Sequence, residues 1–151
     1  MKGYLILILL LAVVSLSAQG RAEEAVQKTI ETFFKGFHTQ DSVIMKSAVG
    51  EDPILQSIGN DKDGVPGMRS ERFDRLIQSI VAIPDSINFQ EKITSYTIQV
   101  DGAMANAWTP YEFWINDNFS HCGVNSFQLF NDGQGWKIIY LIDTRRKKDC
   151  K

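Results

Sequence analysis

One histidine and one aspartate have the residue types of an acid/base pair. His121 can exchange a proton near neutral pH. By alternation along a predicted strand, it shares a face with Phe119, Asn125 and Phe127. Asp143 lies near the end of the last predicted strand, where it could orient the imidazole for dehydration or isomerisation of a carbonyl compound. A structural hydrogen bond between strands, or two solvated surface residues, is the alternative explanation of the same positions.

A second group of side chains has the properties of ligand contacts. Large aromatic residues with a polar group are common in ligand clefts and at protein interfaces, and they crowd residues 108–114. Arg145 could pair with an anionic group of a ligand. The predicted ligand-binding residues are Trp108, Tyr111, Asn125, Phe127 and Arg145. Trp108 and Tyr111 fall on opposite faces of their strand, so at most one of them lines a cavity; core or dimer packing is the alternative use.

The sequence contains two cysteines, Cys122 and Cys150. In an oxidising compartment, two cysteines with no other partner form a disulfide by default, and this one would tie the C-terminal tail to a strand. Two unpaired thiols are the alternative, because a sequence carries no geometry. The spacing of the cysteines does not match a structural zinc site, and the two histidines are scattered, so we predict no metal site.

Several function classes lack support in the sequence. No nucleophile elbow, glycine-rich phosphate cradle or zinc motif occurs, and we predict no cofactor. The acidic residues of the segment 59–67 lack the spacing and the closing glutamate of a calcium loop. The chain has 16 Lys and Arg against 18 Asp and Glu, a net charge of −2, and the basic residues form no long stripe, so nucleic acid is not an expected partner. The basic run 145–148 is interpreted as a solvated C-terminal end.

The first residues have the layout of a signal peptide. Lys2 precedes an unbroken apolar run, residues 4–16, which ends in a small and polar stretch. The run is shorter than a membrane-spanning helix requires, so we expect cleavage after Ala18 and no membrane attachment afterwards; a retained anchor is the alternative. We therefore predict a signal peptide over 1–18, a single domain over 19–151, and a secreted or periplasmic protein.

Periodicity predicts an α+β domain. Apolar residues at helical spacing predict a helix over 22–37, and Asp41 can cap a second, short helix over 42–48. A strand over 54–58 and a loop over 59–67 precede a third helix, which Ser70 can cap and Pro84 ends. From Phe89 onward, strands alternate with turn signals at 101–102, 116–118 and 131–135, and a change of phase predicts a bulge near Ser95.

This order of elements resembles the cone-shaped fold of the nuclear-transport-factor-2-like superfamily. The most specific segments are 54–58, 119–127, 135–139 and 143–146. They are similar to a secreted bacterial branch of that superfamily that carries the label lumazine-binding. The resemblance implies three N-terminal helices packed in a strongly curved antiparallel sheet, whose open end can hold a small apolar or aromatic molecule.

The resemblance and the residues leave three functions open. The alternating small residues Ala103, Ala105 and Ala107 could leave room for a ligand or let a helix approach closely. Ketosteroid isomerase resembles the chain in architecture, but its carboxylate base would fall near Ser57, so that activity is not expected. We predict a secreted small-molecule-binding domain and leave catalysis open. The alternatives are a lyase or isomerase that uses His121 and Asp143, and a structural module that forms homodimers.

Overall fold

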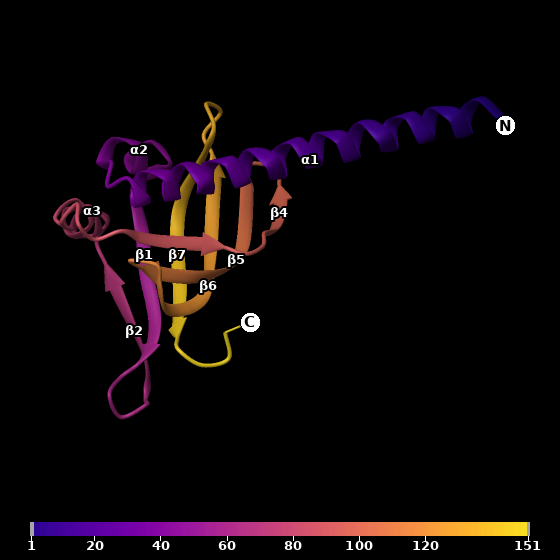
Figure 1. Ribbon diagram of the computed structural model, residues 1–151. Coiled ribbons are helices and arrows are strands. Elements are labelled where there is room, and N and C mark those ends of the chain that lie inside the picture. Colours follow the sequence, from indigo (N-terminus) through magenta and orange to yellow (C-terminus); the bar gives the residue numbers. More distant parts are fainter. Residues whose placement is uncertain (1, 151) are drawn as a thin grey trace.

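The computed structural model describes residues 2–150, with side chains from Gln19 onward (Figure 1). The helices are α1 (Lys2–His38), α2 (Ser42–Ser47) and α3 (Phe73–Val81). The strands are β1 (Val49–Asn60), β2 (Pro66–Glu71), β3 (Phe89–Ile93), β4 (Thr97–Asp101), β5 (Met104–Ile115), β6 (Asn118–Asn131) and β7 (Trp136–Arg146). The chain is therefore α+β, as predicted.

All strands described belong to one curved sheet, with α1 lying across it and α3 at one end (Figure 1). The order is β2-β1-β7-β6-β5-β3, and β4 also pairs with β5. The prediction of a purely antiparallel sheet is wrong at one place, because β1 and β7 pair in parallel. Tight turns fix the direction of strands that follow one another in the sequence, whereas no turn links β1 to β7.

The core lies between α1 and the sheet. The apolar stripe of α1 presents Val26, Ile30 and Phe33, which are buried with residues of β5, β6 and β7 in one cluster. This confirms the amphipathic helix predicted from spacing. Ala105 and Ala107 are also buried in this cluster, so the small side chains of β5 favour close packing of the helix over an internal cavity there.

The caps of the two short helices differ from each other. The side chain of Asp41 accepts hydrogen bonds from the backbone N–H groups of Val43 and Ile44 at 2.8 and 3.0 Å, as predicted for the start of α2. The predicted cap of α3 is wrong: Arg72 precedes that helix without a side-chain cap. Ser70 instead belongs to β2 and pairs with Gln56 of β1.

The segment expected to be a loop forms a β-hairpin. β1 continues to Asn60 and β2 begins at Pro66, so only the tip of the segment 59–67 is a turn. Gly59 and Gly67 lie opposite each other in the antiparallel register. The segment 51–53, which precedes the predicted strand 54–58, also belongs to β1, and the register with β7 shifts there. The glycines and acidic residues that predicted a loop thus occur within a long, twisted hairpin.

The turns between the later strands match their sequence signals. Asn116 and Asp117 have φ angles of 47° and 62°, which Asn and Asp tolerate better than most residues, and they connect β5 to β6. Gly102, with φ of 58°, helps to connect β4 to β5. The predicted change of phase near Ser95 is the break between β3 and β4, which both pair with β5.

The side chains of the predicted signal peptide, residues 1–18, lie outside the part of the protein that the structure describes. α1 includes residues from Lys2 onward, and it is longer than the helix expected from position 22. Within the described part of the chain, no helix combines the length and the apolar character needed to cross a membrane. The division into a signal peptide and a domain over 19–151 stays a prediction.

Candidate functional site

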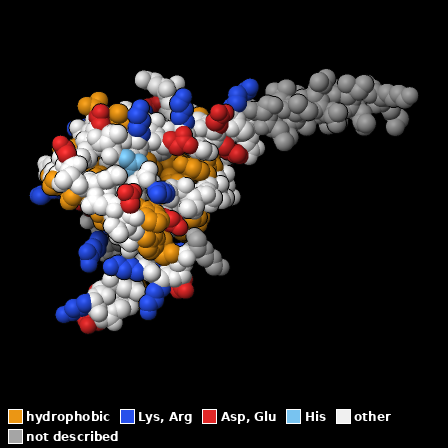
Figure 2. Space-filling view, viewed as in Figure 1, with side chains coloured by type: hydrophobic (Ala, Val, Ile, Leu, Met, Phe, Trp, Pro, Cys, Tyr) orange, Lys and Arg blue, Asp and Glu red, His pale blue; other side chains and the backbone are white. Residues whose placement is uncertain are grey.

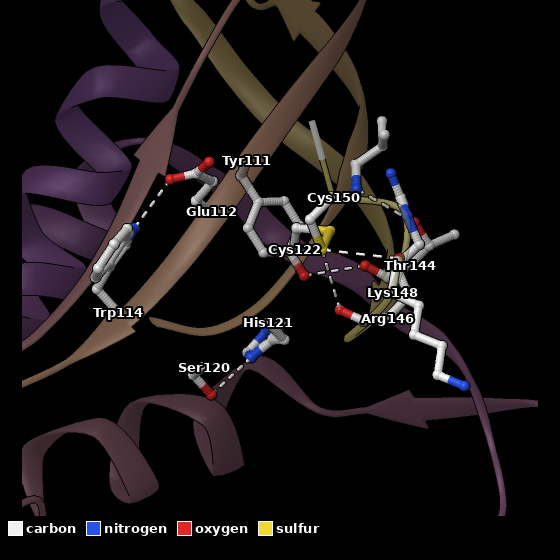
Figure 3. The surroundings of a disulfide bond; sticks show 11 residues. Tyr111, Glu112, Trp114, Ser120, His121, Cys122, Thr144, Arg146, Lys148 and Cys150 are labelled. Carbon is white, nitrogen blue, oxygen red and sulfur yellow. Dashed lines mark hydrogen bonds between the residues drawn. A yellow bond between two sulfur atoms is a disulfide. The ribbon is translucent and has the colours of Figure 1, made fainter. Parts of the chain in front are cut away.

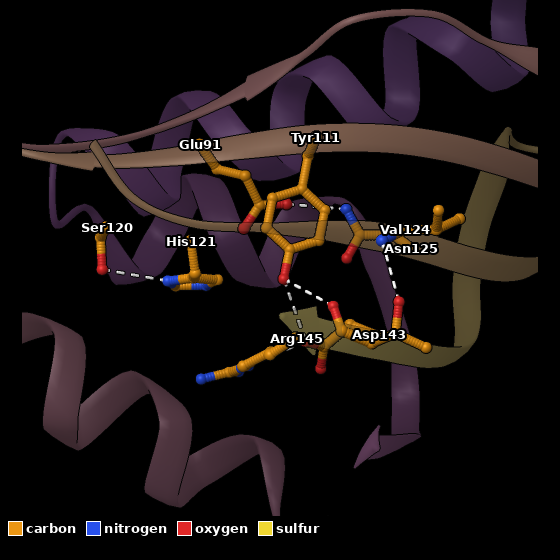
Figure 4. Close-up of polar contacts among 9 residues, drawn as sticks. Glu91, Tyr111, Ser120, His121, Val124, Asn125, Asp143 and Arg145 are labelled. Atoms are coloured by element: carbon orange, nitrogen blue, oxygen red, sulfur yellow. Dashed lines mark hydrogen bonds and ion pairs between the residues drawn. The ribbon is translucent and has the colours of Figure 1, made fainter. Parts of the chain in front are cut away.

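Six polar residues gather on the inward face of the sheet, beside the buried core (Figure 4). We call them the polar cluster: Glu91 from β3, Tyr111 from β5, His121 and Asn125 from β6, and Asp143 and Arg145 from β7. Alternation explains the grouping, because inward-facing positions recur every second residue along each strand. The antiparallel register also places Gly123 opposite both Tyr111 and Arg145, and Asn125 opposite Asp143.

Tyr111, Asp143 and Arg145 form the best-connected part of the cluster. The Tyr111 hydroxyl lies 3.0 Å from the backbone oxygen of Thr144 and 3.3 Å from Oδ2 of Asp143, both of which are acceptors. Arg145 Nε donates to the same Oδ2 at 2.8 Å. Burial raises the pKa of Tyr111, and the nearby carboxyl groups of Glu91 and Asp143 act in the same direction. Tyr111 therefore stays a protonated hydrogen-bond donor.

Gly123 makes this arrangement possible. A Cβ atom at this position would overlap the backbone oxygen of Thr144 and lie 2.8 Å from ring and hydroxyl atoms of Tyr111. The aromatic ring can cross the neighbouring strand only because Gly123 has no side chain. The backbone of β6 is thus shaped to hold the Tyr111 hydroxyl against β7.

Glu91 and Asn125 form the second connected pair. Asn125 Nδ2 donates to Glu91 Oε1 at 2.7 Å, and Asn125 is 3% exposed. Burial raises the pKa of Glu91 to about 7, against the opposing effect of the Asn125 hydrogen bond, while the negative charge of Asp143 contributes a smaller increase. The backbone N–H of Glu91 donates to His38 Nε2 at 2.9 Å, so α1 also holds this residue in place.

His121 stands at the edge of the cluster. Its Nδ1 lies 3.1 Å from the Ser120 hydroxyl, and its ring stacks on Phe113 with centroids 4.8 Å apart. Burial lowers its pKa, and the positive charge of Arg145 lowers it further. Among the hydrogen bonds of the described residues, none joins His121 to Asp143. The two residues share the cluster without a hydrogen bond between them, and their catalytic roles stay predictions.

The other residues proposed from the sequence separate into different environments. Tyr111, Asn125 and Arg145 belong to the polar cluster, whereas Phe127 is fully buried in the core. Trp108 is 52% exposed on the opposite face of β5 from Tyr111.

Phe119 does not share a face with His121, so that prediction is wrong. The register of β5 with β6 shifts beside Ser120: Phe113 pairs with His121, but Trp114 pairs with Phe119. This irregularity reverses the alternation, and Phe119 packs against Trp114.

A groove of about 790 Å³ opens beside the cluster. Its walls come from β1, the β1–β2 hairpin, α3 and β7. Leu55, Leu76 and Leu141 supply apolar surface, and Asp143 and Arg145 supply charge where the groove meets the polar cluster. Figure 2 shows the hairpin projecting from the body of the protein, with basic and acidic side chains at its end. The groove thus combines an apolar wall with an ion pair at one end.

The predicted disulfide is confirmed. Cys122 of β6 and Cys150 of the tail are bonded, with Cα atoms 5.8 Å apart (Figure 3). Cys122 pairs in register with Arg146, so the antiparallel pairing of β6 with β7 returns the tail to the beginning of β6. Cys122 follows His121 directly in the sequence, so its bond to Cys150 fixes the tail next to the polar cluster.

Glu91 is the cluster residue that the sequence prediction missed. It lies on the same face of β3 as Phe89, which belongs to the core cluster, and Ile93, which packs against that cluster. A glutamate at an inward position between two apolar residues was the available signal, since buried carboxyl groups are rare. In the part of the chain that the structure describes, no group of three or more His, Cys, Asp or Glu side chains could hold a metal ion.

Comparisons with known proteins identify the fold. No family model matches the sequence, and a search of curated proteins finds no match. Among solved structures, an NTF2-like protein with a cystatin-like fold from Novosphingobium aromaticivorans has a TM-score of 0.67 at 13% identity, covering 93% of this chain and 90% of the other.

Two further structures support the same fold. An NTF2-like protein of unknown function from Shewanella baltica has a TM-score of 0.57 at 18% identity, covering 83% of this chain and 94% of the other. A candidate dehydratase of the NTF2-like family from Streptomyces avermitilis has a TM-score of 0.62 at 12% identity, covering 82% and 95%. The chain therefore has the cystatin-like α+β fold of the NTF2-like proteins.

Proposed function

We propose that the protein is a secreted domain that binds a small apolar or aromatic molecule in the groove beside the polar cluster. The groove carries this proposal. Its volume of about 790 Å³ lies within the range typical of small-molecule sites. Such sites combine mostly apolar walls with a few polar groups that orient the ligand. Here the leucines of β1, α3 and β7 would contact the apolar part of a ligand, and Arg145 would bind a polar group.

Arg145 is suited to this role because most of its donors remain available. Its Nε donates to Asp143, while the side chain is 60% exposed. A guanidinium group has five N–H donors in a planar arrangement that matches a carboxylate or carbonyl oxygen. Asp143 would therefore hold Arg145 in place, and the outer nitrogen atoms would face the ligand.

A binding measurement tests the proposal. Phenylacetate and its neutral analogue phenylacetamide would be titrated into ¹⁵N-labelled protein, and backbone amide shifts would be followed by NMR. We expect shifts at residues of the groove, including Leu55 and Leu141. Arg145→Gln should weaken phenylacetate binding at least tenfold, whereas Arg146→Gln, which changes the next residue on β7, should not. Shifts spread over the whole surface, or none with either compound, would contradict the proposal.

A lyase or isomerase is a second candidate. The observation that favours it is the ionisable ring of His121, which lies close enough to Asp143 and Arg145 for both charges to affect its pKa. The Streptomyces avermitilis protein of the same fold, a candidate dehydratase, makes such chemistry reasonable to test. Turnover of a small hydroxy ketone that His121→Asn abolishes would support it.

Secretion is part of the proposal. The apolar run after Lys2 predicts export, and a disulfide is typical of proteins in oxidising compartments. Mass spectrometry of the exported protein should give an N-terminus between Gln19 and Glu23. An exported protein that retains Met1 would contradict cleavage. The label lumazine-binding adds one more compound to test, since lumazine is a small aromatic molecule.

A further inference from the structure

Arg69 of β2 belongs to a row of polar residues that crosses three strands. It pairs in register with Ser57 of β1, and Ser57 pairs with Asp143 of β7. Residues directly opposite each other in neighbouring strands have side chains on the same face of a sheet, and all three of these residues line the groove. Because β1 lies between β2 and β7 (Figure 1), the Cα atoms of Arg69 and Asp143 are separated by two strand spacings, about 10 Å.

Arg145 reaches the same part of the groove from the other side of β1. β1 and β7 run in parallel, with Ile58 opposite Thr144. The next residue on β1 is Gly59, so it lies beside Arg145. Nε of Arg145 also donates to Oδ2 of Asp143, a member of the polar row. Since long side chains reach diagonal neighbours on adjacent strands, the arginines of β2 and β7 both reach the space above β1.

The floor between the two arginines is made of small residues. Ser57, Gly59 and Gly67 all line the groove. A Cβ atom on Gly59 would meet no other atom within 4 Å, and one on Gly67 would meet only the backbone oxygen of Gly59, at 4.0 Å. Ser57 adds a single hydroxyl group, which can donate a hydrogen bond. The space above β1 is therefore open to a small polar group of a ligand.

Arg69 has donors to offer such a group. Within the part of the chain that the structure describes, no hydrogen bond or ion pair involves its side chain, whereas Arg72 and Arg145 each form an ion pair. Asp61 also lines the groove, but its Oδ1 accepts two backbone N–H groups at 2.9 Å in the turn of the hairpin. The polar row thus carries one guanidinium group held by Asp143 and a second one that no acidic side chain of the groove pairs with.

The next row along the strands is apolar at its centre and acidic at its edge. Leu55 pairs with Leu141 on one side and with Glu71 on the other, and all three line the groove. Leu55 lies two residues before Ser57, a distance of about 7 Å along a strand. A ring with a short polar arm spans this distance. Its apolar part would lie against the leucines, where the charge of Glu71 repels any further anionic group.

We propose that Arg69 and Arg145 together bind the carboxylate of a small monocarboxylic acid above Ser57 and Gly59. This inference rests on the proposed function and names the class of its ligand. The planar guanidinium groups match the two carboxylate oxygens from opposite sides of β1. The apolar part of the acid lies against Leu55 in the neighbouring row.

Calorimetric titration with phenylacetate tests the role of Arg69. Arg69→Gln should weaken binding about tenfold, because hydrogen bonds between charged groups are lost. Arg69→Lys keeps the charge without the planar pair of donors, so its affinity should fall between those of Arg69→Gln and wild type. Neutral phenylacetamide should bind wild type and Arg69→Gln equally. Arg75→Gln is the matched control and should bind phenylacetate like wild type, because Arg75 is exposed on α3 and does not line the groove.

A second titration tests the restriction to monocarboxylic acids. The compound 4-carboxyphenylacetate carries an additional carboxylate on the far side of the ring, which would lie beside Glu71. It should bind wild type more weakly than phenylacetate does. Glu71→Gln removes the repelling charge and should reduce this difference. Equal affinities of wild type for the two acids would overturn the restriction.

The outcomes separate this inference from the proposed function. Equal affinity of phenylacetate for wild type and Arg69→Gln, with weaker binding to Arg145→Gln, would overturn the role of Arg69 and leave binding in the groove standing. A loss of phenylacetamide binding in Arg69→Gln as large as the loss of phenylacetate binding would show that Arg69 supports the hairpin instead of the carboxylate, which also overturns the inference. Failure of wild type to bind either compound would contradict both proposals.

Discussion

Tyr111 crosses Gly123 of the neighbouring strand so closely that a Cβ atom at position 123 would lie 2.8 Å from its ring and hydroxyl. This contact brings the hydroxyl to the backbone oxygen of Thr144 and to Asp143. A missing side chain on β6 therefore positions a hydrogen-bond donor from β5 against the ion pair on β7. The position of Arg145 beside the groove depends on the same contact, because Arg145 binds the carboxylate that Tyr111 supports.

Gly123→Ala should destabilise the protein strongly. The added methyl group would overlap the backbone oxygen of Thr144, and relief requires movement of β6 or β7. We expect a loss of about 3 kcal/mol in the free energy of unfolding, measured by urea denaturation. Gly59→Ala is the control, because nothing lies within 4 Å of its added Cβ atom. A Gly123→Ala protein as stable as Gly59→Ala would show that the crossing of Tyr111 is looser than described.

The pH dependence of stability should reveal Glu91. Burial raises the pKa of Glu91 to about 7 in the folded protein, against an ordinary value near 4.5, so the folded state binds the proton more tightly. The stabilisation is complete below the ordinary pKa and is lost as the pH rises towards 7. Relative to wild type, Glu91→Gln should therefore gain up to about 3 kcal/mol in unfolding free energy between pH 4.5 and 8.

The two histidines change the unfolding free energy with pH in the opposite direction to Glu91. Their contributions cancel when Glu91→Gln is compared with wild type. Burial lowers the pKa of His38 and His121, so their contribution is present at higher pH and is lost as the pH falls below their ordinary pKa of 6.5. Both rings remain in Glu91→Gln, which isolates the carboxyl group. If the unfolding free energies of wild type and Glu91→Gln changed with pH in the same way, the raised pKa of Glu91 would be contradicted. Glu112→Gln is the control for removing a glutamate that faces outward from β5.

The disulfide should stabilise the protein without being essential to the fold. It joins residues 28 apart in the sequence, for which loop-closure entropy gives about 3 kcal/mol. The hydrophobic cluster between α1 and the sheet contains neither cysteine. Replacing Cys122 and Cys150 together by serine should lower the unfolding free energy by about this amount and preserve the far-ultraviolet circular dichroism. Loss of that spectrum, or free thiols in the unfolded, unreduced wild-type protein, would contradict the prediction.

The outer face of β5 and β6 should mediate a homodimer. Met104 and Phe130 pair across these strands and are 56% and 48% exposed, and Trp108 lies on the same face of β5. Adjacent exposed apolar side chains on a sheet suit a second copy of the same face. Light scattering should give the mass of a dimer for wild type and of a monomer for Trp108→Arg. A wild-type monomer at millimolar concentration would exclude this interface.

The sequence predicted those parts of the fold that depend on local pattern. The stripe of α1, the Asp41 cap and the turn at Asn116 and Asp117 follow from residues close together in the chain. The parallel pairing of β1 with β7 joins segments far apart, which no local pattern specifies. The cap predicted at Ser70 failed for the same reason, because pairing with Gln56 draws that residue into a strand.

The candidate site shows a similar division. Alternation correctly placed Asn125 and Phe127 on the same face of β6 as His121, but a single register shift beside Ser120 moved Phe119 to the other face. Glu91 was missed because its main partner, Asn125, lies two strands away, and strand alternation does not indicate which inward residues meet. The expected contact between His121 and Asp143 is replaced by contacts of His121 with Ser120 and of Asp143 with Tyr111 and Arg145.

Native mass spectrometry of the exported protein, purified without added ligand, tests the central claim most directly. The account predicts a population heavier than the bare chain by the mass of one small organic molecule. That molecule should be released on denaturation and identified as an organic acid, and it should be depleted in Arg145→Gln but retained in Arg146→Gln. Bare protein throughout, together with a phenylacetate titration that leaves the amide signals of Leu55 and Leu141 unmoved, would contradict the claim that this groove binds a small molecule.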